Sequence, residues 1–167
     1  MSFKNWMSIL IILILLLPQI NCKAQIETKK NNINTQLLGN GLIVSLNYER
    51  QIVKNPNLRI HAGAGIYGRE KQFLTIPVGL TYLMKLNNKS SLDYGIGMTY
   101  TKAEAFYYVC FKLSSTYIEN QPHYILVPSL QYRYQPNENV FIRFGFTPVI
   151  TNMGFIPMVG FSCGYPF

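Results

Sequence analysis

The sequence lacks several features on which membrane proteins and enzymes often depend. After residue 24 it contains no run of about 18 apolar residues, the length that would predict a membrane-spanning helix. It has only two histidines, and no group of His, Cys, Asp and Glu has the spacing of a metal site. No helix is predicted after its glycine pairs that could hold a phosphate group. We therefore predict no helical membrane span, no metal and no cofactor.

Charged residues and cysteines are also scarce. Charged residues make up 13% of the chain, and the 15 basic residues outnumber the 7 acidic ones. A basic surface attracts phosphate-bearing lipids or nucleic acid, and the export signal described below favours lipid as the partner over nucleic acid. Of the three cysteines, Cys110 and Cys163 follow the predicted leader, and an oxidising compartment would permit a disulfide between them. We expect two free thiols, because Cys163 lies on an outward-facing strand register and Cys110 in a connection.

The first 24 residues have the pattern of an export signal. Lys4 precedes an apolar run of about eleven residues that ends at Pro18, which is shorter than the roughly 20 residues a membrane span needs. We predict cleavage after Ala24, so that residues 1–24 are a signal peptide. A lipoprotein reading, with Cys22 as the acylated residue, stays open. We expect residues 25–32 to be flexible and residues 33–167 to form one domain.

The end of the chain shows a strict alternation of two kinds of residue. Apolar or aromatic residues stand at every odd position from Val159 to Phe167, and the positions between them are small residues or proline. A period of two predicts a strand with one apolar face. A terminal strand of this kind would be an aggregation-prone edge in a soluble domain. A transmembrane barrel uses such a strand to close its ring.

The same alternation recurs along the chain and predicts six more strands. In the first of them, Leu42, Val44, Leu46 and Tyr48 share the outward face. The six segments are residues 42–52, 58–67, 73–86, 92–101, 124–135 and 140–147. With the terminal strand they make seven, whereas single-chain bacterial barrels have an even number. The eighth strand is residues 33–38 or residues 105–113, and we favour residues 33–38. The sequence thus predicts an all-β fold, an antiparallel up-and-down transmembrane β-barrel of eight strands.

The inner face is polar and carries most of the strand charges. Buried charges need partners, so we predict a network of ion pairs and hydrogen bonds inside the barrel. Its members are Glu49, Arg59, His61, Asp93, Arg133 and Arg143. An eight-stranded barrel is only just wide enough for its own side chains, which argues against a wide pore.

Several segments resemble a known family. Residues 38–41 (LGNG), 45–50 (SLNYER), 132–136 (YRYQP), 141–148 (FIRFGFTP) and 160–167 (GFSCGYPF) are similar to small outer-membrane β-barrel proteins of Bacteroidota-type bacteria, of the eight-stranded OmpA/OmpX-like kind. Proline at position 166 departs from the serine or threonine common there. The resemblance implies a monomer in the outer membrane, among lipid and lipopolysaccharide. It also implies that Phe161, Tyr165 and Phe167 form the signal read by the barrel-assembly machinery.

Three functions remain open from the sequence. We favour a structural or surface-interaction role without catalysis, in which aromatic residues between positions 102 and 123 contact a partner; these are Tyr107, Tyr108, Phe111 and Tyr117. A narrow pore for small solutes or ions is the first alternative. A lipid A-modifying enzyme centred on His123 is the second. It has little support, because the His and Ser two residues apart that mark lipid A deacylases are missing.

Deletion of Phe167 tests the terminal strand. We expect the shortened chain to assemble poorly in the membrane, because the last aromatic anchor of the closing strand is lost. The amount of membrane-inserted protein, compared with that of the full chain, measures the effect. Unchanged insertion would contradict the assembly role.

Overall fold

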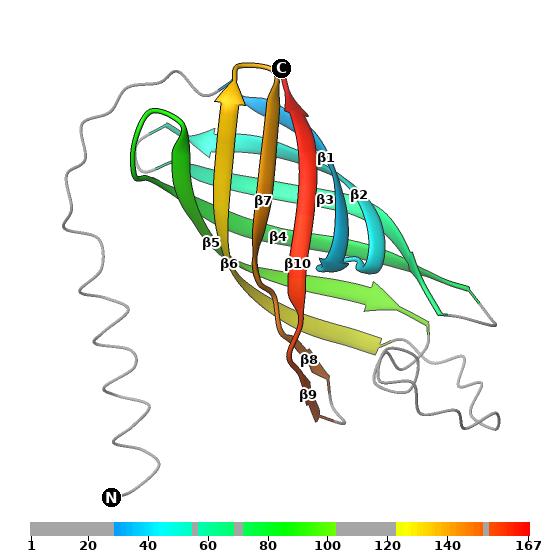
Figure 1. Cartoon of the computed structure of the whole chain (residues 1–167). Helices are drawn as coiled ribbons and strands as arrows, with labels where there is room; N and C mark the ends of the chain where they lie inside the picture. Colours follow the sequence, from blue (N-terminus) through cyan, green and yellow to red (C-terminus); the bar gives the residue numbers. More distant parts are fainter. Residues whose placement is uncertain (1–28, 55–56, 69–71, 103–122, 152–153) are drawn as a thin grey trace, which may run out of the picture.

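The computed structural model describes residues 29–54, 57–68, 72–102, 123–151 and 154–167, and the described residues form strands joined by turns. Ten strands are labelled in Figure 1. Their bounds are β1 Asn31–Gly39, β2 Leu42–Val53, β3 Leu58–Tyr67, β4 Phe73–Lys85, β5 Ser90–Thr101, β6 His123–Asn137, β7 Val140–Phe146, β8 Val149–Thr151, β9 Gly154–Ile156 and β10 Val159–Pro166. No helix among the described residues is long and apolar enough to cross a membrane.

The strands form a closed ring. Neighbours in sequence pair antiparallel from β1 to β6, and β6 pairs with β7. β7 pairs with β10, and β10 pairs with β1, which closes the ring (Figure 1). In the closed ring each of the eight barrel strands has two neighbours, so the ring itself has no edge with unpaired backbone groups; β9, in the hairpin beyond it, pairs with β8 alone among the described strands. The predicted antiparallel eight-stranded barrel is confirmed.

Two prolines explain why eight barrel strands carry ten labels. β7 is followed by β8 and β9 leads into β10, with Pro148 in the first gap and Pro157 in the second. The pairing of β7 with β10 continues without a shift of register into the pairing of β8 with β9. The two prolines therefore stand opposite each other. Proline has no N–H to donate to a ladder. Facing prolines therefore interrupt both strands at one level, and the β8–β9 hairpin extends the barrel wall beyond it.

Apolar residues point outward and polar residues inward, as the alternation predicts. On β10, Val159 is 64% exposed and Phe161 45%, whereas Ser162 between Phe161 and Cys163 is fully buried. Cys163 is exposed and forms no disulfide, as expected; Cys110 lies outside the described residues. The outer surface is therefore a continuous apolar belt, and the inner surface is shielded from solvent.

The eighth strand is β1, the favoured of the two alternatives. It pairs on one side with β2 and on the other with β10. It begins at Asn31, two residues before the expected start at Ile33, because Asn31 exchanges backbone hydrogen bonds with Phe167 (3.2 and 2.8 Å). The alternative segment, residues 105–113, lies outside the described residues.

The first hairpin departs from the predicted pattern at its turn. Leu42 was expected to face outward, but it is completely buried inside the barrel. Leu38 and Leu42 flank the turn with positive φ angles of 54° and 71°, conformations that L residues rarely adopt. This bend carries Asn40 and Leu42 into the lumen, and in Figure 1 the β1–β2 turn stops short of the level that β3 and β4 reach.

A disulfide across the seam between β1 and β10 tests the closure and its register. Thr35 lies directly opposite Cys163, and both side chains face outward. In a chain with Cys22 and Cys110 replaced by serine, we expect Thr35→Cys to form a disulfide with Cys163 on mild oxidation, because paired residues of neighbouring strands lie within disulfide reach. Boiled, non-reduced protein should then migrate faster on a gel than reduced protein.

The matched control is Leu37→Cys, which lies opposite Phe161 on the same face. We expect far less cross-linking at this position. Equal cross-linking at positions 35 and 37 would contradict the register, and none at either would contradict the closed seam.

Candidate functional site in the barrel lumen

A cluster of buried ion pairs fills the lumen near the end that holds the chain terminus, called here the termini end. Glu49 on β2 is its centre: one carboxylate oxygen accepts from Arg59 (3.2 Å) and Arg133 (2.9 Å), and the other from Arg143 (2.9 Å). Asp93 on β5 accepts from Arg133 Nε at 2.7 Å. All five side chains are at most 7% exposed. We call these five residues the ion cluster.

The ion cluster joins strands around nearly the whole ring. Asn32 on β1 donates to the Glu49 carboxylate (2.9 Å), and Arg143 on β7 donates through Nε to Ser162 on β10 (2.9 Å). With the other members on β2, β3, β5 and β6, seven of the eight barrel strands contribute a side chain. Charged hydrogen bonds inside a low-dielectric space are strong when every partner is present. The cluster therefore ties the wall together from within.

Two arginines of the ion cluster stand directly opposite each other. Arg133 and Arg143 are paired residues of β6 and β7, an arrangement that is unfavourable for like charges. Glu49 bridges them, and the ring of Phe141, which is fully buried, lies 4.4 Å from the Arg133 guanidinium carbon and 5.1 Å from that of Arg143. An aromatic face attracts cations. Phe141 was not singled out from the sequence, although it shares the inward register of Arg143.

The middle of the lumen holds the inward turn of the first hairpin. Asn40 binds His61 through its side-chain amide at 2.7 Å, and Thr99 donates to the Asn40 carbonyl. Thr75 donates to the neighbouring carbonyl of Gly41 at 3.2 Å. The turn approaches β5 so closely that a Cβ at Gly97 would lie 2.6 Å from Asn40 Oδ1. Threonines on β4 and β5 thus satisfy turn carbonyls that would otherwise be buried unpaired.

His61 lies in the lumen but outside the ion pairs of the described residues. Its second ring nitrogen is 3.4 Å from Thr81 Oγ1. It was grouped with the charged residues in the sequence analysis, and the structure separates it from them: it positions the hairpin turn through Asn40. His123 begins β6.

The opposite end of the lumen, called here the loop end, is apolar. We call its buried residues the apolar cluster: Leu42, Tyr67, Ile125, Val127, Val149, Ile156 and Met158. Tyr67 satisfies its hydroxyl by a 2.9 Å hydrogen bond to Thr101. This cluster departs from the polar inner face that the alternation predicts. The sequence signal was the apolar run through residues 124–127, in which Ile125 and Val127 have the inward register.

The residues of the predicted assembly signal lie on the outer surface. Phe161, Tyr165 and Phe167 are 45–52% exposed and share one face of the closing strand. The four aromatic residues proposed as surface contacts, at positions 107, 108, 111 and 117, lie outside the described residues. No group of three or more His, Cys, Asp and Glu among the described residues could hold a metal ion.

The fold is a closed eight-stranded antiparallel barrel. Its outer surface is apolar, and its lumen is polar and filled by side chains. Two solved structures share this fold. The N-terminal β-barrel domain of Pseudomonas aeruginosa OprF aligns with a TM-score of 0.59 at 11% identity, over 83% of this chain and 96% of that one. The Yersinia pestis outer membrane protein Ail, in a phospholipid bilayer nanodisc, aligns with a TM-score of 0.50 at 13% identity, over 83% and 99%.

These likenesses show the barrel fold. The sequence itself matches no protein-family model and no curated protein. Both structural neighbours are barrels of outer-membrane proteins, which fits the resemblance found in the sequence.

Substitution of Glu49 tests the ion cluster. We expect Glu49→Gln to lower the free energy of unfolding by about 3–5 kcal/mol, because three buried arginines would then share the single carboxylate of Asp93. Urea unfolding of the detergent-solubilised barrel measures this. Glu138→Gln, at an exposed turn acid, is the control and should change stability by less than about 0.5 kcal/mol. Equal effects of the two substitutions would contradict the central role of Glu49.

Proposed function

We propose that this protein is an outer-membrane β-barrel with a structural or surface-interaction role, without catalysis and without an open pore. The observation that carries the proposal is the combination of an apolar outer belt with a lumen filled at three levels by the ion cluster, the first hairpin turn and the apolar cluster. Each level is made of side chains that are nearly inaccessible to solvent.

The outer belt supports a membrane location. Leu74 is 63% exposed and Leu46 58%, among 29 large apolar residues exposed on the described surface. A soluble protein rarely exposes so large an apolar area. Aromatic pairs also lie towards both ends of the belt, with Tyr82 and Tyr94 at the termini end (ring centroids 4.8 Å apart) and Tyr100 and Tyr124 at the loop end (5.7 Å). Such girdles mark the two interfaces of a membrane barrel.

Connection lengths support an orientation. At the termini end the strands are joined by short turns, such as those at residues 86–89 and 138–139. At the loop end β5 and β6 are joined by the longest connection, residues 102–122. Bacterial barrels have short periplasmic turns and longer extracellular loops. We therefore place the termini end in the periplasm, consistent with export by the predicted signal peptide, and residues 102–122 outside the cell.

This orientation assigns partners to the two ends. Residues 107–117 would present their four aromatic side chains outside the cell, where they can anchor a surface contact. Lipid and lipopolysaccharide would surround the belt, and the barrel-assembly machinery would read Phe161, Tyr165 and Phe167 during biogenesis. The eight-stranded ring has no free strand edge through which a second copy could pair, and among the described strands the one-sided β9 has only three residues, which favours a monomer.

Conductance in a planar lipid bilayer tests the closed lumen. We expect the purified protein to add no steady conductance, because water and ions would have to pass the apolar cluster and the ion cluster in series. A general porin inserted under the same conditions is the positive control. Stable conductance steps from correctly folded protein would contradict the proposal and favour the narrow pore.

A further inference from the structure

The ion cluster contains more positive than negative charge. Three guanidinium groups, those of Arg59, Arg133 and Arg143, share the carboxylates of Glu49 and Asp93. The pairing of Arg143 with Asp93 is the longest, at 3.6 Å. An uncompensated charge is costly to bury in a space shielded from water. The cluster as described therefore needs one further negative charge nearby.

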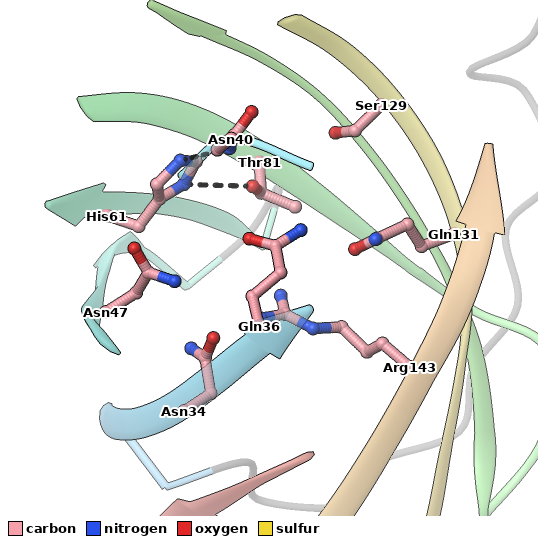
Figure 2. A pocket seen from close by; sticks show the side chains of 9 residues that line it. All are labelled: Asn34, Gln36, Asn40, Asn47, His61, Thr81, Ser129, Gln131 and Arg143. Atoms are coloured by element: carbon pink, nitrogen blue, oxygen red, sulfur yellow. Dashed lines mark hydrogen bonds between the residues drawn. The ribbon is translucent and has the colours of Figure 1, made fainter. Parts of the chain in front are cut away.

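A polar cavity adjoins the ion cluster on the side of the first hairpin turn. It has about 310 Å³ of space, including its opening. Figure 2 shows its lining: Asn34, Gln36, Asn40, Asn47, His61, Thr81, Ser129, Gln131 and Arg143. Arg143 supplies the charge of this lining, which contains no carboxylate. The enclosed part of this space, about 20 Å³ for the centre of a water-sized group, holds one water or one halide ion.

Amide groups in the cavity have hydrogen-bonding capacity that the described residues do not use. Asn34 is 2% exposed and Gln131 5% exposed, and both side chains point into the space in Figure 2. The Nδ2 atom of Asn34 and the Nε2 atom of Gln131 have no hydrogen-bond partner among the described residues. Buried N–H donors without a partner are unfavourable. In Figure 2 these two amides lie on opposite sides of the Gln36 and Arg143 side chains. A buried donor such as Gln131 Nε2 near a guanidinium is a suitable partner for an anion.

We propose that this cavity binds a small monovalent anion of the size of chloride, held by the Gln131 amide beside the Arg143 guanidinium. The anion supplies the missing negative charge and accepts from a donor that the wall leaves unused. The amide oxygens of Asn40 and Asn47 also have no partner among the described residues. The site would stabilise the barrel by an amount that rises with the logarithm of the anion concentration above the dissociation constant, independently of its role in the membrane.

Thermal unfolding in two salts tests the site. The full protein, purified in detergent, is heated in mixtures of sodium chloride and sodium gluconate at constant ionic strength, which holds charge screening fixed. We expect the midpoint to rise by about 5 °C for each tenfold increase in chloride above the dissociation constant, and bromide to act similarly. Equal midpoints in chloride and in the bulky gluconate would overturn the proposal.

Substitutions at Gln131 give the sharpest comparison. Gln131→Glu places a carboxylate of almost the same shape in the cavity, so we expect a higher midpoint than wild type in gluconate and no dependence on chloride. Gln131→Leu removes a donor and should weaken the dependence on chloride. The control is Thr101→Val, which alters a buried lumen residue outside the cavity. It should lower the midpoint and keep the wild-type response to chloride.

Crystals of the unaltered protein grown in sodium bromide give an answer that needs no variant to fold. We expect an anomalous scattering peak within hydrogen-bond distance of Gln131 Nε2 and near Arg143. A cavity that contains only water at high bromide would overturn the proposal. So would a Thr101→Val protein that loses its response to chloride while Gln131→Glu keeps it.

Discussion

The constraint on which the structure depends is that every backbone N–H and C=O inside a membrane must find a partner within the protein. An open sheet cannot meet it, because its edge strands leave a row of groups unpaired in hydrocarbon. The chain meets it by joining β1 to β10, so that its first and last strands become neighbours. In the membrane location proposed above, the outward apolar residues follow from this closure, since a closed wall in lipid can bury its polar residues only inward. Pro148 and Pro157 have no N–H to donate, and they stand opposite each other. Both strands are therefore interrupted at the same level.

Closure also encloses polar side chains in the lumen, where they need hydrogen-bond and ion-pair partners. Polar side chains turned inward leave both lipid and bulk water, so they must satisfy each other. The ion cluster does so at the termini end through Glu49, which serves three arginines, while threonines of β4 and β5 satisfy the first hairpin turn at mid-height. The apolar cluster completes the filling at the loop end. The same interior that stabilises the wall supports the proposal that the lumen is not an open pore.

The fold was predictable because a strand alternates its side chains strictly: the pattern from Val159 to Phe167 assigns each residue a face, and the inward register of Glu49 and Arg133 places both in the lumen. What the pattern could not supply depends on backbone bending and on which strands meet. Leu42 turns inward because the positive φ angles beside the turn break the alternation there. His61 hydrogen-bonds the turn and takes no part in the ion pairs of the described residues, because Asn40 lies within reach of its ring.

We propose that the chain forms a closed barrel in the membrane with its apolar face outward. Heat-modifiable mobility on a gel tests this most directly, with protein extracted from the outer-membrane fraction. A closed barrel resists SDS until it is boiled. We therefore expect unboiled and boiled samples of the protein to migrate differently on the gel. Identical mobilities, together with recovery of the protein in the soluble fraction, would contradict it. The inner and outer faces would then be reversed, as in a soluble ligand-binding barrel.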